Sequence, residues 1–121
     1  MLLLSQSIYS QNKSATSYWN KAVLSSKKAV QSYNNYAKEP TNCDKVKKLK
    51  NACHLYLKTI DNLEMAITNE ENFSSTPNKG FIRKCKKNIK TFEIARTKAK
   101  GKYKQLKSYC NREEENRHLL E

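Results

Sequence analysis

The residues of this chain best suited to covalent or metal chemistry are its four cysteines, Cys43, Cys53, Cys85 and Cys110. No two of them have the two-residue spacing of a zinc knuckle. A catalytic thiol would need a positioned base, but His54 follows Cys53 directly, and adjacent residues of a helix point in different directions. An even number of cysteines in a small, lysine-rich domain predicts two disulfides and an oxidising compartment. The alternative is four buried thiols in a cytosolic helix bundle.

Other catalytic constellations are not suggested by the sequence. Asp61 and Glu64 form the one carboxylate pair at a useful helical spacing. They flank Leu63 of an apolar stripe, so a position at the solvated edge of that stripe is favoured over a catalytic role. Two isolated glycines do not build a phosphate-binding loop. We therefore expect a protein that is not an enzyme, with no catalytic residues, no metal ligands and no cofactor.

A cationic segment at residues 79–110 carries twelve lysines and arginines against one carboxylate, Glu93. Its net charge of +11 is most of the chain's +13, and such a surface attracts acidic partners. The predicted partner-binding residues are the basic side chains Lys79, Arg83, Lys84, Lys86, Lys87, Lys90, Lys98, Lys100, Lys102, Lys104 and Lys107. A secondary basic patch is predicted at Lys45, Lys47, Lys48 and Lys50.

Several partners fit this charge: an acidic protein, heparan sulfate, an anionic membrane surface or a nucleic acid. Tyrosines among the lysines make a nucleic acid a candidate partner. However, Tyr103 and Tyr109 lie on or beside an apolar stripe, where core packing explains them better than base stacking. Disulfides also place the protein away from intracellular nucleic acid. We expect a protein partner or an acidic polysaccharide, with solubility as the remaining explanation of the lysines.

Long helices are expected to position these residues. The chain of 121 residues has room for one domain, and two glycines and two prolines leave little material for the turns of a sheet. Disorder is the alternative at 29% charged residues, but sustained apolar periodicity argues against it. The first amphipathic segment covers about residues 4–38 and ends before Pro40, and Thr41 or Asn42 is suited to cap the next helix.

The second and third segments carry the clearest apolar stripes. In the second, residues alternate strictly at steps of three and four, the pattern of a helix packed against neighbours: Val46, Leu49, Cys53, Tyr56, Ile60, Leu63 and Ile67. Turn signals follow at residues 70–79. The third segment has an apolar stripe that is broken only at Arg96, and this stripe places the lysines on the opposite, outer side of the helix. The residues of the stripe are Ile82, Cys85, Ile89, Phe92, Ala99, Tyr103, Leu106 and Cys110.

The predicted fold is all-α: a single domain, residues 1–121, in which three long antiparallel helices are stapled by two disulfides. Gly101 leaves a fourth helix open, because the third segment could either kink or reverse there. Residues 112–121 are expected to form a frayed polar extension. No apolar run reaches the length of a membrane span.

Helix rise gives a criterion for pairing the cysteines. A tight turn between the second and third segments puts Cys53 level with a residue in the nineties, away from Cys85. A loop of nine or ten residues could instead lower the third helix and bond Cys53 to Cys85, and a reversal at Gly101 would then bring Cys110 to Cys43. We prefer this nested pairing. The alternative, Cys43–Cys53 with Cys85–Cys110, requires the second helix to begin after about residue 50.

Two family resemblances follow. Residues 55–67, LYLKTIDNLEMAI, resemble part of the four-helix plant pectin methylesterase and invertase inhibitors, but Cys53 lies one residue too close to Tyr56 and the N-terminal cysteine hairpin of that family is missing. The whole profile resembles the small salivary proteins of anopheline mosquitoes, the anophensin and albicin family. It does so in its four cysteines, its basic helices and a mature-looking start after Met1.

The second resemblance implies a secreted, all-helical protein with two disulfides. Members of that family inhibit host plasma cascades, namely the alternative complement pathway or the contact activation that forms kinins. We therefore expect a secreted, monomeric, non-enzymatic inhibitor of a host plasma protein complex, with a polyanion-binding module as the alternative.

Overall fold

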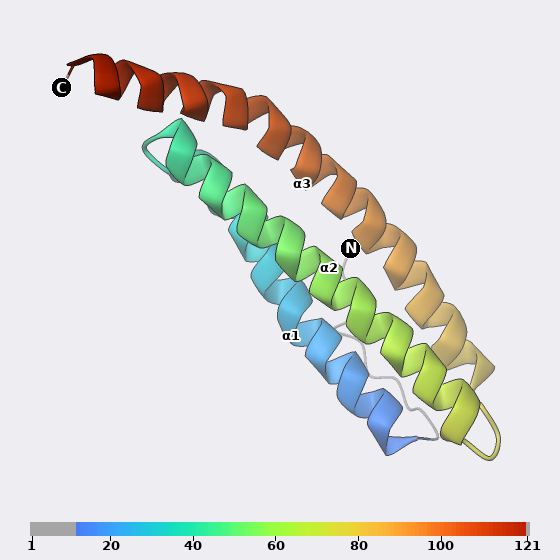
Figure 1. Ribbon diagram of the computed structural model, residues 1–121. Coiled ribbons are helices and arrows are strands. Elements are labelled where there is room, and N and C mark those ends of the chain that lie inside the picture. Colours follow the sequence, from blue (N-terminus) through green and yellow to red (C-terminus); the bar gives the residue numbers. More distant parts are fainter. Residues whose placement is uncertain (1–11, 121) are drawn as a thin grey trace.

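Three long helices run antiparallel to their neighbours in the computed structural model, which describes residues 12–120 (Figure 1). They are α1 (Lys13–Asn35), α2 (Asn42–Phe73) and α3 (Lys79–Leu120), with a 3₁₀ turn, η2 (Tyr36–Lys38), after α1. Helix α2 is the central element, because α1 and α3 both pack along it. The predicted all-α fold is confirmed, and the part of the first segment before residue 12 lies outside the described residues. None of the described helices is long and apolar enough to cross a membrane.

Side-chain caps set where the helices begin. Thr41 Oγ1 accepts a hydrogen bond from the backbone N–H of Asp44 (3.0 Å) at the start of α2, so Thr41 is the cap of the two candidates. Asn78 Oδ1 accepts from the N–H of Phe81 (3.0 Å) at the start of α3, and Asn12 caps α1 in the same way. Each cap satisfies an N–H group that the first helical turn leaves without an intrahelical partner.

The apolar stripe of α2 forms the centre of the core, as predicted. Leu63 is fully buried and Tyr56 nearly so. The Tyr56 ring lies 6.0 Å from the ring of Phe92 on α3. Near the α2–α3 loop, Trp19 of α1 reaches across to Phe81 of α3, with ring centroids 5.6 Å apart. These contacts join all three helices into one hydrophobic core.

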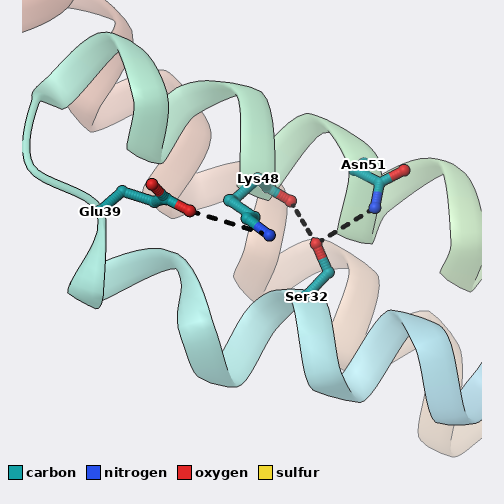
Figure 2. A network of polar contacts seen from close by, with 4 residues as sticks. All are labelled: Ser32, Glu39, Lys48 and Asn51. Atoms are coloured by element: carbon teal, nitrogen blue, oxygen red, sulfur yellow. Dashed lines mark hydrogen bonds and ion pairs between the residues drawn. The ribbon is translucent and has the colours of Figure 1, made fainter.

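The contact between α1 and α2 is made largely by small side chains, which let the two helices approach closely. The buried small residues of α1 are Ala15, Ala22, Ser25, Ser26, Ala29 and Ser32. The hydroxyls of Ser25 and Thr59 lie 2.8 Å apart inside this contact. Ser32 Oγ donates to the backbone carbonyl of Lys48 (2.9 Å) and accepts from Asn51 Nδ2 (3.3 Å), as Figure 2 shows. The buried hydroxyls are therefore hydrogen-bonded, which burial requires.

Helix α3 is one helix of 42 residues that curves around α2 (Figure 1). Its predicted apolar stripe faces the core, with Phe92 and Ala99 buried. The helix runs through Gly101, so a reversal there is wrong, and residues 12–120 form three α-helices rather than four. A Cβ at Gly101 would meet no atom within 4 Å, so packing does not require a glycine. Residues 112–120 belong to α3 and project past the end of α1 and α2 (Figure 1).

One of the two predicted disulfides is present. Cys43 and Cys110 are bonded, with an S–S distance of 2.05 Å. The predicted Cys53–Cys85 bond is wrong, because both of these thiols are free. Helices α2 and α3 extend into the region expected to be loop and leave five residues between them. The two helices are therefore aligned as expected for a tight turn, not for a long loop. Cys53 therefore lies close to Lys100 and about 22 Å along α3 from Cys85, whereas bonded cysteines have Cα atoms about 4.4–6.8 Å apart.

Candidate functional site: the cationic face of helix α3

Helix α3 presents its predicted basic residues to solvent. Ten of the eleven side chains are exposed, and Lys84 is half-buried. We define the cationic face of α3 as the ten exposed members: Lys79, Arg83, Lys86, Lys87, Lys90, Lys98, Lys100, Lys102, Lys104 and Lys107. At the rise of an α-helix, this face is about 42 Å long. Glu93 is the one carboxylate in the same stretch of sequence.

The cationic charges of α3 repel one another. The eleven predicted residues include nine pairs at the i,i+3 or i,i+4 spacing that makes side chains neighbours on a helix. At about 0.2–0.5 kcal/mol for each pair, the repulsion at low salt is about 2–4 kcal/mol. Lys98 and Lys107 lie near tyrosine rings, with Nζ 6.0 Å from the Tyr33 centroid and 5.4 Å from the Tyr103 centroid. Such contacts do not neutralise the charge, so the repulsion between the cations persists in the folded protein. A bound anion would reduce this repulsion.

An exposed isoleucine lies within the cationic face. The side chain of Ile94 is 71% exposed, one helical turn from Lys90 and one from Lys98. It was missed by sequence reasoning, which counted apolar residues only along the core stripe. Its signal was its position two residues after Phe92, because that spacing turns it away from the buried side of the helix. An apolar side chain with a lysine one helical turn away on either side combines an anchor for burial with charges that orient a partner.

The secondary patch does not form a second cationic face. Lys45 and Lys48 are half-buried, whereas Lys47 and Lys50 are exposed. Lys48 Nζ lies 3.7 Å from Glu39 Oε1 (Figure 2). Lys47 and Lys48 also line a cavity of about 330 Å³ together with two carboxylates, so the local charge is balanced. This cavity is lined by α2 and the residues just before it, not by α3.

The two unpaired thiols are poorly suited to nucleophilic chemistry. Burial raises the pKa of Cys53, although nearby cations on α3 oppose the shift. Burial, followed by the charge of Glu70, raises the pKa of Cys85 to about 12. Both thiols are therefore protonated at neutral pH, and the thiol form is a weak nucleophile. In the described part of the chain, one cluster of possible metal ligands joins Glu114 to the two cysteines of the disulfide, and bonded sulfurs are not thiolate ligands.

The described residues thus offer a long cationic helix face with an apolar side chain at its middle. No family model, no curated protein and no solved structure matches this chain.

Proposed function

We propose that this protein is a secreted, non-enzymatic inhibitor that binds an acidic surface of a host plasma protein complex through the cationic face of α3. The observation that carries this proposal is the exposure of ten cations along residues 79–107 of a single helix, a stretch that contains one carboxylate, Glu93. An acidic partner relieves their repulsion and is steered toward them from a distance. Ile94 supplies the apolar contact that charge alone lacks.

Secretion is part of the proposal and is supported by the Cys43–Cys110 disulfide, since such bonds persist mainly in oxidising compartments. The profile resemblance to anopheline salivary proteins of the anophensin and albicin family suggests two targets. These are the convertase of the alternative complement pathway and the factors of contact activation. Occupying an acidic docking surface on either complex would block assembly without any catalytic step.

A second candidate function is binding of a polyanion along α3, which the nine like-charged pairs favour. Ile94 separates the two candidates. A linear polyanion held by charge gains little from this side chain, whereas a shaped protein surface would gain about 1.5–3 kcal/mol by burying it.

The test is inhibition of two cascades by the purified, oxidised protein: alternative-pathway lysis of erythrocytes and kallikrein generation in plasma. The wild type should inhibit one of them. Neutralising the lysines around Ile94, in the variant Lys87→Gln/Lys90→Gln/Lys98→Gln, should weaken inhibition about tenfold, because three exposed charge contacts are lost. Ile94→Ala should also weaken it, at unchanged net charge.

A matched control carries the same loss of charge elsewhere, in the exposed residues Lys21, Lys28 and Lys58 of α1 and α2. The variant with glutamine at these three positions should inhibit like the wild type. The proposal fails if the wild type inhibits neither cascade, or if the two triple variants lose inhibition equally. Inhibition that is unchanged by Ile94→Ala, together with a steep loss of binding in salt, would favour the polyanion candidate.

A further inference from the structure

A polar groove between α1 and α2 forms a second cationic site. It consists of two adjoining cavities of about 390 Å³ and about 460 Å³, which share Lys28 and Leu55 in their linings. The described lining residues of both cavities all belong to α1 and α2, so this groove is separate from the cationic face of α3. Along α1 it extends from Lys21 to Asn35, which is about 21 Å at the rise of a helix.

The charge of the groove is positive over this length, although the ammonium of Lys48 is paired with Glu39 at one end. Its four charged lining residues are Lys21, Lys28, Lys48 and Lys58. No carboxylate from residues 12–120 lines either cavity. The next cavity, of about 330 Å³, begins at Lys48 and brings in Glu39 and Asp44, so the purely cationic stretch ends there. The groove therefore favours an extended anion of limited length over a single small anion.

Hydrogen bonds between the two helices hold the groove in shape. Ser32 joins α1 to the Lys48 carbonyl and to Asn51 on α2, and the Lys48 ammonium is held by Glu39 (Figure 2). At its other end, the Ser25–Thr59 hydroxyl pair fixes the spacing of the helices. A ligand would thus meet a preformed site and lose less free energy in ordering the protein.

The remaining lining residues identify the class of ligand. Gln31, Asn51 and Asn62 offer amides, which suit hydroxyl groups, and Leu24 and Leu55 offer apolar contact for the faces of sugar rings. Among the described residues no aromatic side chain lines either cavity, so these residues do not offer the stacking that holds single-stranded nucleic acids. We propose that the groove between α1 and α2 binds a linear sulfated glycan, with its lysines on the sulfate and carboxylate groups.

The test uses a heparin-derived hexasaccharide and the isotope-labelled full chain. Backbone amide shifts should change most at the groove, around Lys28 of α1 and Asn51 of α2. Calorimetry at physiological ionic strength should show binding that weakens about tenfold in Lys21→Gln/Lys28→Gln/Lys58→Gln, as expected for three lost charge contacts. The α3 variant with glutamine at positions 87, 90 and 98 has the same net charge, and it should leave the amide shift changes around Lys28 and Asn51 in place.

Three outcomes would overturn the inference. One is a shift map confined to α3 or spread evenly over all lysines. Another is an equal loss of hexasaccharide affinity in the two triple variants, which would mean that net charge alone decides binding. The third is preferential binding of a single-stranded oligonucleotide in the groove. Cascade inhibition is measured separately on the same variants, so the glycan site and the proposed inhibitory function stand or fall independently.

Discussion

Removal of the Cys43–Cys110 disulfide should lower the free energy of unfolding by about 4 kcal/mol. The bond links residues separated by 67 positions, and the chain-entropy relation gives this value for a loop of that length at 25 °C. The loss is a large share of the roughly 5–15 kcal/mol typical of a domain. It should fall unevenly on the structure. Beyond Ala99, the described side chains of α3 before Cys110 include only the half-buried Tyr103 and Leu106 on the core side, so this part of the helix depends on the bond.

Urea unfolding followed by helical circular dichroism, on the wild type and on Cys43→Ser/Cys110→Ser, measures the global loss. Hydrogen exchange should accelerate most at the amides of residues 100–113. Cys53→Ser is the control, since it breaks no covalent bond, and its change should stay below about 1 kcal/mol. A double variant within about 1 kcal/mol of the wild type would refute the reasoning, as would peptide mapping that finds Cys53 bonded to Cys85.

Three further predictions concern buried groups and surface charge. Because the folded pKa of Cys85 is raised from its ordinary value of 9.0 to about 12, its neutral thiol contributes stability that is complete below pH 9 and lost as the pH rises toward 12. Cys85→Ala should flatten that alkaline loss in pH-dependent melting, and an unchanged profile would contradict the assignment. Glu70 is fully buried and accepts from Ser74 Oγ (2.9 Å) and from the N–H of Asn78 (2.8 Å), so Glu70→Ala should cost about 2 kcal/mol or more in urea unfolding. The exposed neighbour, in Glu71→Ala, should cost under about 0.5 kcal/mol, and equal costs would count against the role of Glu70. Raising the salt to about 1 M, where the Debye length is about 3 Å, should raise the melting temperature, because salt screens the repulsion among the cations of α3. A fall in the melting temperature would argue against this repulsion.

Helix content and buried faces could be predicted because the apolar period is local information. Leu63 on α2 and Phe92 on α3 lie in stripes at steps of three and four, and both are buried in the structure. Thr41 was one of two candidate caps for α2, and its hydroxyl makes the bond. The exposure of the α3 lysines followed from the same period, since residues off the stripe face solvent.

Register between helices could not be predicted with the same certainty. It depends on where α2 ends and α3 begins. A difference of a few loop residues changes which residue of α3 lies beside each residue of α2. The expected loop of nine or ten residues allowed a Cys53–Cys85 bond, whereas the five-residue loop excludes it. Gly101 was likewise predicted as a possible point of chain reversal, but the helix continues through it. A Cβ at this position would meet no atom, so the packing there does not depend on glycine.

By itself the sequence determined three amphipathic helices, a cationic outer side on the third and the pairing of Cys43 with Cys110 as a candidate. Only the tertiary structure decided which thiols stay free, which apolar side chain stands among the lysines and how lysines from two helices come to share one groove. The physical reason is that a helix positions its own residues at a fixed rise and angle. The alignment of one helix with another is set by loop length and by contacts such as Ser32 with Lys48, which join residues distant in the chain.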